Sequence, residues 1–388
     1  MYFKRKIDSS LDIWLINYKY PALIVGIRQC GKTESIIEFA KRNKLNMLYI
    51  NFWTNPEICE DFDSKLDVDT IISNLSLRFP NNKITEDTLI FFDEIQDCPR
   101  ARLTFKNFAQ DNRYKVIGSG SYLGINGYNI GDTTPIPTGY EEVFELNTMD
   151  FEEFLWALGY TDNQINILIE HFNNKTKIPN NIHELYKDLY LKYAMIGGFP
   201  KVVKTYVDTH MISKAYEVLN STVFDIQSDF GRRKDKNGNA IFNAREVTKI
   251  KSVFELIPTF LAKESKRFIV SKVSGGTQYD KNNAIEYLRQ AHIVSKVFNL
   301  EVRSLPLIGS KIESQFKLFP TDIGIVTSMY GIDTVAQMNK GELGQGSGGL
   351  YEALVFDGLN KCGIVPYYFA KESGLEIDFV ISYKGILH

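Results

Sequence analysis

Short apolar runs recur along the first part of the chain, with polar, helix-like segments between them. They cover residues 22–25, 48–52, 89–92 and 114–117. Continuous apolar runs of this length are typical of strands buried on both faces. Strands that alternate with helices form a parallel sheet with helices packed on both sides. The pattern therefore predicts that residues 1–146 form an α/β domain.

A helical period replaces this alternation over residues 147–230. The apolar positions fall on two helix faces: Met149, Phe151, Phe154, Leu155 and Leu158 on one, and Leu185, Leu189, Tyr193 and Ile196 on the other. A Gly-Gly-Phe-Pro segment at 197–200 breaks the second of these helices. Apolar stripes at this spacing are typical of packed helix faces. We predict a helical region here and assign it no chemistry.

Residues 231–330 carry a third pattern. Its elements are, in order, a basic polar run, a helix, a turn, a second helix and two strands: 231–239, 247–261, 274–277, 281–291, 293–300 and 316–319. Two helices followed by paired strands predict a winged helix, a motif whose second helix can enter the major groove of DNA.

Basic side chains in this region could contact the phosphates of duplex DNA. The candidates are Lys251, Lys263, Lys266, Arg267, Lys272, Lys281 and Arg289. Acidic residues are interspersed among them: Glu255, Glu264, Asp280 and Glu286. Because winged helices also serve as protein-contact modules, the sequence leaves both a DNA partner and a protein partner open.

Residues 331–388 form the last region. Its predicted elements are a glycine-rich run, a helix and two strands, at 344–349, 350–361, 366–369 and 376–381. Glu352 on the helix and Asp378 on the last strand could share a metal ion with later ligands, but the sequence stops at His388. An incomplete α/β domain is therefore predicted.

Composition narrows the class of protein. The chain has 388 residues, of which 44% are hydrophobic and 24% are charged, as in soluble globular proteins of two or three domains. A formal net charge of −2 gives no overall attraction to nucleic acid. The cysteines are scattered without a C-x-x-C pair, which favours a reducing cytoplasm over structural zinc. No apolar run approaches the length of a membrane span, so we expect a cytoplasmic protein without membrane segments.

One glycine-rich segment has a phosphate-binding pattern. It follows the apolar run at 22–25 and matches G-x-x-x-x-G-K-[S/T] at every fixed position: Gly26, Ile27, Arg28, Gln29, Cys30, Gly31, Lys32 and Thr33. A strand, such a loop and a following helix surround a polyphosphate with backbone N–H groups. Lys32 would reach the β and γ phosphates of a bound nucleotide, and Thr33 would offer its hydroxyl to Mg²⁺; the loop pattern itself leaves ATP and GTP open. The alternative is a glycine turn that only ends a strand.

A pair of carboxylates follows another strand, because the run at 89–92 ends in Asp93 and Glu94. Ligands of open α/β sheets bind at the carboxyl ends of the strands. Asp93 is thus a candidate for the Mg²⁺ shell, and Glu94 is a candidate general base for the attacking water. The alternative is that both residues only cap a helix that begins near Gln96.

A Gly-Ser-Gly-Ser segment at 118–121 follows the run at 114–117 and is interpreted as a polar turn at a strand end. At this place Ser119 could sense the γ phosphate. An ordinary turn without a function is the alternative.

In this order the motifs resemble those of prokaryotic AAA-type ATPases, and more narrowly the group whose carboxyl-terminal part is the domain of unknown function DUF4143. The segments that carry the resemblance are 26–33, 89–96, 119–121, 151–155, 197–200, 317–324 and 376–380. Together they span nearly the whole chain. The resemblance implies binding and hydrolysis of ATP, a winged-helix element and a terminal fold similar to restriction-type nucleases.

Two features depart from that family. Much of it has a Gly-Arg pair ahead of the Phe-Glu-Glu-Phe-Leu segment, where this chain has Gly139-Tyr140. An arginine that stabilises the charged transition state would have to come from elsewhere, and the candidates are Arg28, Arg100, Arg232 and Arg233. Nuclease-like members also continue into a Glu-x-Lys strand that this sequence does not contain, so we expect no nuclease activity from this polypeptide.

The sequence therefore predicts an α/β P-loop ATPase core, a helical region, a winged-helix element and a truncated nuclease-like domain. The expected function is Mg²⁺-dependent hydrolysis of ATP that rearranges the downstream modules. A nucleotide-gated switch with little turnover and an ATP-powered DNA-processing protein are the alternatives. A protein partner or a second copy of the chain is a further candidate for what the protein binds.

Overall fold

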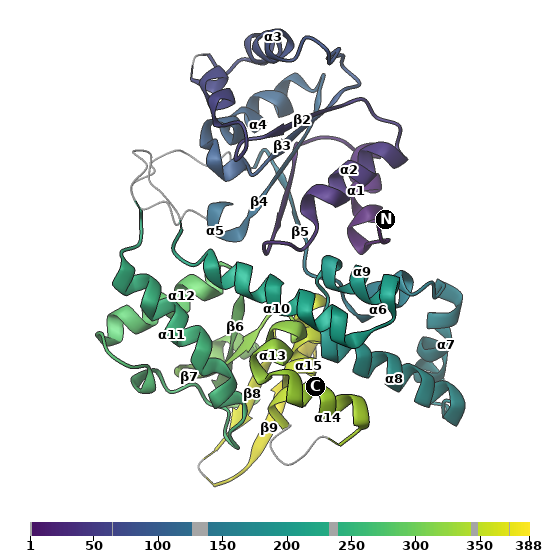
Figure 1. Ribbon diagram of the computed structural model, residues 1–388, viewed down its shortest axis with the longest axis vertical. Coiled ribbons are helices and arrows are strands. Elements are labelled where there is room, and N and C mark those ends of the chain that lie inside the picture. The colour runs from purple at the N-terminus through teal and green to yellow at the C-terminus, as the bar shows by residue number, and fades with distance from the viewer. Residues whose placement is uncertain (1, 64, 126–138, 233–239, 343–347, 372) are drawn as a thin grey trace. The chain divides into compact units, whose positions relative to one another are not determined.

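The computed structural model describes residues 2–63, 65–125, 139–232, 240–342, 348–371 and 373–388, and the chain folds into two compact units, Met1–Asn147 and Thr148–His388 (Figure 1). Most of the basic run at 231–239, including Arg233, and most of the glycine-rich run at 344–349 lie outside the described residues. Within the described ranges, no helix has both the length and the apolar character that crossing a membrane requires.

A parallel sheet of five strands forms the centre of the first unit, in the order β2-β3-β4-β1-β5. The strands are β1 (Ala22–Gly26), β2 (Met47–Asn51), β3 (Leu89–Asp93), β4 (Lys115–Ser121) and β5 (Glu142–Glu145). β1 and β3 are buried along their whole length, as expected for strands covered on both faces. The α/β fold predicted for this part of the chain is confirmed.

Helices cover both faces of the sheet because successive side chains of a strand point to opposite sides. Leu23 and Val25 of β1 belong to the core covered by α3 (Val68–Arg78) and α4 (Pro99–Asp111). On the other face, α2 (Lys32–Arg42) packs against the central strands and α1 (Lys6–Ile16) packs against α2. The shorter η1 (Pro56–Phe62), η2 (Ile95–Asp97) and α5 (Tyr122–Ile125) lie in the connections.

The prediction of a polar turn at 118–121 is wrong, because these residues form the second half of β4 and are buried. Gly118 allows α4 to approach the strand closely: a Cβ atom added there would lie 2.9 Å from the Phe105 ring. Small residues thus serve close packing here, and the strand continues through them.

The second unit begins with a group of helices, as predicted: α6 (Phe151–Ala157), α7 (Asp162–Asn173), α8 (Asn180–Ile196), α9 (Pro200–Thr209) and α10 (Ile212–Ser228). Local sequence sets their ends. Asp150 caps α6 by accepting a hydrogen bond from the Glu153 backbone N–H at 2.9 Å. Gly197, with φ of 70°, ends α8 in a conformation that favours glycine.

The rest of the unit combines helices with a mixed sheet (Figure 1). Its helices are α11 (Ala244–Leu261), α12 (Gln278–Gln290), α13 (Ile323–Tyr330), α14 (Ile332–Lys340) and α15 (Gly348–Lys361). Its sheet has the order β7-β6-β8-β9, with β6 (Val294–Leu300), β7 (Lys311–Pro320), β8 (Tyr367–Ala370) and β9 (Glu376–Val380). A short hairpin of β10 (Ser382–Tyr383) and β11 (Ile386–Leu387) follows.

The antiparallel pair β6 and β7 follows α11 and α12, in the order predicted for a winged helix, but it belongs to a larger sheet. β6 pairs in parallel with β8 through Asn299 and Tyr368. The buried Asn299 side chain adds two hydrogen bonds, donating to the Ala370 carbonyl at 3.1 Å and accepting from the Ala370 N–H at 2.9 Å. A separate winged helix and a separate nuclease-like domain are therefore not confirmed.

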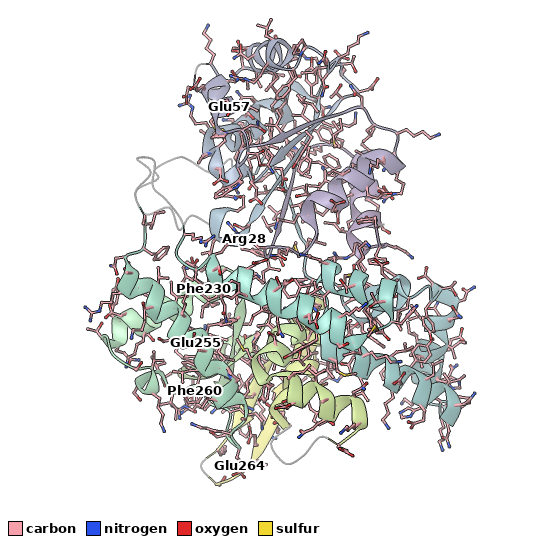
Figure 2. All side chains as sticks on the ribbon, in the orientation of Figure 1. Arg28, Glu57, Phe230, Glu255, Phe260 and Glu264 are labelled. Carbon is pink, nitrogen blue, oxygen red and sulfur yellow. The ribbon has the colours of Figure 1, made fainter. Side chains whose placement is uncertain are left out.

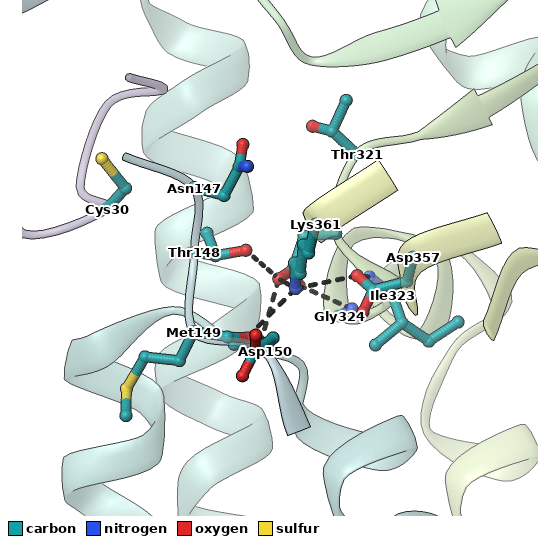
Figure 3. Close-up of polar contacts among 12 residues, drawn as sticks. Cys30, Asn147, Thr148, Met149, Asp150, Thr321, Ile323, Gly324, Asp357 and Lys361 are labelled. Atoms are coloured by element: carbon teal, nitrogen blue, oxygen red, sulfur yellow. Dashed lines mark hydrogen bonds and ion pairs between the residues drawn. The ribbon is translucent and has the colours of Figure 1, made fainter. Parts of the chain in front are cut away.

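A buried ion network joins several helices of the second unit (Figure 3). The side chains of Lys361, Asp322 and Asp357 are at most 2% exposed, and Lys361 Nζ lies 2.9 Å from Asp322 Oδ2 and 2.8 Å from Asp357 Oδ1. The Tyr193 hydroxyl of α8 donates to Asp357 Oδ2 at 2.6 Å. Burial alone would lower the pKa of Lys361, but the two carboxylates outweigh it and raise that pKa. The lysine therefore stays charged inside the unit.

Candidate functional site

The glycine-rich loop runs from the end of β1 to the beginning of α2, and its backbone requires both fixed glycines. Gly31 has φ of 97°, a conformation that side-chain-bearing residues rarely adopt. At Gly26 the reason is space, because an added Cβ atom would lie 2.3 Å from the Leu146 carbonyl oxygen. The sequence between them is thereby held as a compact turn between strand and helix.

The loop lysine lies against the loop itself. Lys32 Nζ donates hydrogen bonds to the carbonyl oxygens of Gly26 and Ile27, both at 3.1 Å, and the residue is 7% exposed. These carbonyls are neutral partners, and a phosphate oxygen would form stronger, charge-assisted hydrogen bonds with the same ammonium group. The position fits the role predicted for Lys32.

The structure brings the other predicted residues together around Asp93, which ends β3 and is 2% exposed. Thr33 Oγ1, in the first turn of α2, donates to Asp93 Oδ2 at 3.0 Å. The buried Ser119 hydroxyl on β4 donates to Asp93 Oδ1, which also accepts from the Glu94 backbone N–H at 3.1 Å. The Asp93 carboxylate at the end of β3 thus connects α2 with β4.

Sequence reasoning missed two residues of this site, Tyr49 and Asn51 on β2. The Tyr49 hydroxyl donates to Asp93 Oδ2 at 2.9 Å, and Asn51 Nδ2 donates to the same oxygen at 3.1 Å. Burial raises the pKa of Tyr49 to about 12, and the charge of Asp93 adds to this effect, so the hydroxyl keeps its proton. Tyr49 and Asn51 are two positions apart, so the alternation of side chains along a strand places both on one face of β2. Which face meets Asp93 follows only from the pairing of β2 with β3.

The oxygen atoms around Asp93 suit a hard divalent cation. Thr33 supplies a hydroxyl and Asp93 a carboxylate, 3.0 Å apart. Among the described residues, no lysine or arginine forms an ion pair with Asp93, and its hydrogen-bond donors are all neutral. A buried carboxylate without a positive partner is costly, and a cation bound here would compensate its charge.

Glu94 lies beside this group in a left-handed backbone conformation, with φ of 52°. Gln96 Nε2 donates a hydrogen bond to Glu94 Oε2 at 2.5 Å and so orients the carboxylate. Glu94 precedes the short helix η2, but its side chain makes no capping hydrogen bond to that helix. The alternative that Glu94 serves only as a helix cap is therefore not supported.

The candidate arginines occupy different environments. Arg28 lies in the loop and is exposed (labelled in Figure 2). Arg100 Nε donates to the Phe62 carbonyl oxygen at 2.7 Å, which holds it near η1. Arg232 is an exposed residue of the second unit, 3.9 Å from Asp229. The fourth candidate, Arg233, lies outside the described residues.

Several basic side chains predicted to contact DNA are already paired within the second unit. Lys266 Nζ lies 2.7 Å from Glu352 Oε1, and Arg289 Nε lies 2.9 Å from Glu286 Oε1. Lys281 is 9% exposed. Figure 2 labels Glu255 on α11 and Glu264 just beyond it, which further reduce the positive charge of this region.

Glu352 and Asp378, the two candidate metal ligands of the last region, lie around a lysine. Lys317 of β7, whose side chain is 0% exposed, lies 3.0 Å from Glu352, 2.9 Å from Glu376 and 3.9 Å from Asp378. Across the described ranges, no group of three or more His, Cys, Asp or Glu residues is arranged to hold a metal ion. The ammonium group of Lys317 compensates the charge of these carboxylates.

Comparisons with known families match two parts of the chain. The family described as "AAA domain" matches residues 18–155, and the family described as "Domain of unknown function (DUF8612)" matches residues 187–336. The downstream match is thus to DUF8612, and the narrower resemblance to the DUF4143 group is not supported. No curated protein matches the sequence.

The comparison with solved structures gives three matches of low sequence identity. The Walker-type ATPase of Pyrococcus abyssi is 14% identical, with a TM-score of 0.48 over 85% of this chain and 96% of its own. The Aeropyrum pernix ORC2 protein is 13% identical, with a TM-score of 0.39 over 88% and 95%. AMPPCP-bound DnaA from Aquifex aeolicus is 10% identical, with a TM-score of 0.30 over 73% and 86%. The part of the chain that contains the glycine-rich loop is therefore similar to the AAA domain family over residues 18–155.

Proposed function

We propose that this protein is a Mg²⁺-dependent ATPase whose active site lies at the carboxyl ends of β1, β3 and β4. The observation that carries the proposal is the convergence on Asp93 of Thr33 from the loop helix and Ser119 from β4. This convergence joins a phosphate-binding loop to a cation-binding carboxylate. A glycine turn that only ends a strand would not require it.

In the proposed site, Lys32 and the N–H groups of the loop hold the phosphates of ATP. The N–H groups at the beginning of α2 add to this, since a helix N-terminus favours negative charge. Thr33 and Asp93 hold Mg²⁺, which when bound neutralises phosphate charge and withdraws electron density from the bond that breaks. Tyr49 and Asn51 keep the Asp93 carboxylate oriented through their hydrogen bonds.

Glu94 acts in the proposal as the general base. Its carboxylate accepts a proton from the attacking water, and the hydrogen bond from Gln96 fixes the orientation of that carboxylate. Ser119 is placed one strand away, on β4, and is proposed to respond to the γ phosphate through its hydrogen bond with Asp93. A positioned general base typically contributes about 10²- to 10⁴-fold to the rate.

Nucleotide state is proposed to be transmitted to the second unit, which starts at Thr148, directly after the first unit ends. The downstream helices and the β6–β7 pair would then serve as a contact module for a partner protein. The pairing of Lys266 and Arg289 with acidic neighbours favours this over DNA binding.

Steady-state ATP hydrolysis with Mg²⁺ tests the proposal, using wild type, Lys32→Ala and Glu94→Gln. Both variants are expected to lose turnover, while Glu94→Gln keeps ATP binding because its loop is unchanged. Lys41→Ala, exposed on the same helix as Lys32, and Glu57→Gln, exposed on η1 (labelled in Figure 2), are matched controls and keep turnover.

Two results would change the assignment. Tight ATP binding by wild type, with no turnover above that of Glu94→Gln, would replace the ATPase by a nucleotide-gated switch. Stimulation of turnover by duplex DNA, lost steeply as salt rises, would favour a DNA-processing protein, because phosphate contacts release counterions.

A further inference from the structure

An arginine near the amino terminus is buried beside the phosphate loop. Arg5 is 3% exposed and precedes α1. Its Nη1 donates a hydrogen bond to the Cys30 carbonyl oxygen at 3.0 Å, and its Nη2 donates to the Asn147 carbonyl oxygen at 2.7 Å. Figure 3 labels Cys30 and Asn147. One side chain thus joins the phosphate loop to the last residue of the first unit.

The backbone of Arg5 is itself held in place. Its N–H donates to Asp8 Oδ2 at 2.9 Å, and the other oxygen of Asp8 accepts from the Tyr2 hydroxyl at 2.8 Å. The Tyr2 hydroxyl oxygen also lies 3.2 Å from Ser35 Oγ on α2, whose proton it can accept. The guanidinium group therefore projects from a support that is tied to the loop helix.

The hydrogen bond to Cys30 bears on the direction of one N–H group of the loop, that of Gly31. The peptide unit between Cys30 and Gly31 is planar, and in a trans peptide the C=O and N–H groups point in opposite directions. Since Arg5 holds the Cys30 carbonyl, the Gly31 N–H is directed away from Arg5.

Asn147 is followed directly by Thr148, the first residue of the second unit. Thr148 Oγ1 donates to Asp322 Oδ2 at 2.5 Å, and the Met149 N–H donates to the Gly198 carbonyl oxygen at 2.7 Å. The residues directly after Asn147 are therefore anchored in the buried network of the second unit.

We propose that Arg5 is a positioning residue. By holding the Cys30 carbonyl it keeps the Gly31 N–H directed for phosphate binding, and by holding the Asn147 carbonyl it couples the loop to the chain segment at Asn147. This inference rests on the proposed nucleotide binding. It has two consequences, which are called the first and second demand below. ATP affinity depends on Arg5, and ATP binding changes the protection of the backbone N–H groups around residues 146–149 from hydrogen exchange.

Arg5→Lys tests the first demand, because one ammonium group keeps the charge but does not span two carbonyls as the planar guanidinium does. The matched control is Arg102→Lys, since the Arg102 side chain is only 13% exposed in the first unit and donates to a carbonyl, that of Ile125 at 2.9 Å. Titration with a fluorescent ATP analogue is expected to give about a tenfold weaker Kd for Arg5→Lys. The control is expected to stay within about twofold of wild type. Circular dichroism verifies that all proteins are folded at the assay temperature.

Hydrogen exchange with and without ATP tests the second demand. In wild type, ATP is expected to change the exchange of the Leu146 and Met149 N–H groups, which donate to Val25 and Gly198 carbonyls. In Arg5→Lys, saturated with ATP at the higher concentration its Kd requires, this change is expected to be lost. A merely structural role for Arg5 would raise exchange equally with and without nucleotide.

Equal affinities of Arg5→Lys and Arg102→Lys would overturn the proposal, as would an unchanged ATP response of residues 146–149 in Arg5→Lys. Failure of the proposed function is a separate result. A wild type that binds ATP without hydrolysing it refutes the ATPase but leaves the Arg5 comparison valid. A wild type that binds no ATP refutes both.

Discussion

Replacing Lys361 by methionine tests the buried ion network of the second unit. The substitution keeps the approximate size of the side chain and removes a charge that lies 2.9 Å from Asp322 and 2.8 Å from Asp357. Removing one partner of a buried ion pair typically costs about 3–5 kcal/mol. Here part of that cost depends on pH, because a carboxylate that loses its cation can take up a proton instead.

The direction of this pH dependence follows from the pKa of Asp357. Burial raises its pKa from 3.8 to about 6, although Lys361 opposes this. A raised pKa in the folded state gives stability that is complete below the unfolded pKa and lost as pH rises through the folded one. Without Lys361 the pKa of Asp357 in the folded state is higher still. The variant therefore continues to lose stability as pH rises above 6, whereas the stability of wild type no longer falls there. The difference in unfolding free energy should grow by about 1.4 kcal/mol per pH unit and reach about 3 kcal/mol at pH 8.

Amide hydrogen exchange measures this difference within the second unit, through peptides from α13 and α15. Opening free energies are compared at pH 6 and pH 8 after correction for intrinsic exchange rates. Lys340→Met, exposed at the end of α14, is the control and should match wild type at both pH values. A Lys361→Met deficit that is the same at pH 6 and pH 8, or one below about 1 kcal/mol at pH 8, would refute the reasoning.

Three further predictions concern single residues. Gly26→Ala should abolish ATP binding in a titration assay, because its Cβ atom would lie 2.3 Å from a backbone oxygen, whereas Gly358→Ala, with nothing within 4 Å, should bind normally. Burial lowers the pKa of His292 to about 4, so its stabilisation is complete above pH 6.5 and lost as pH falls through 4. Wild type should lose up to about 3 kcal/mol more than His292→Asn over that range in urea unfolding, and equal losses would contradict the pKa shift. A hydrogen bond from Cys98 lowers the pKa of the half-buried Cys59, while the pKa of buried Cys98 is raised, so alkylation followed by mass spectrometry should modify Cys59 first. Earlier modification of Cys98 would contradict this order.

The sequence was sufficient to predict the positions of the loop and of the acidic pair at strand ends, while their chemical roles stay predictions. The loop at 26–33 and the pair Asp93 and Glu94 were predicted because each directly follows an apolar run, and the end of a strand fixes where such residues lie. The α/β architecture of the first unit followed from the same alternation. Predictions of this kind succeed because each depends only on residues that are close together in the sequence.

Contacts between distant segments were not predictable in this way. Tyr49 and Asn51 reach Asp93 because β2 is the neighbour of β3. Arg5 belongs to a stretch that is charged and therefore suggests exposure, yet its partners lie 25 and 142 residues away. The segment at 118–121 was misread because glycine favours turns as well as close packing.

The bond between Asn299 and Ala370 has a consequence for synthesis of the chain. These two residues are 71 positions apart, so β6 leaves the ribosome well before its parallel neighbour β8. At about 5–20 residues per second, one edge of β6 waits roughly 4–14 s for its partner strand. An uncovered strand edge can pair with other chains. Slower translation over residues 300–370 should therefore increase aggregation of the nascent protein, and chaperones that bind extended segments should protect it during that interval.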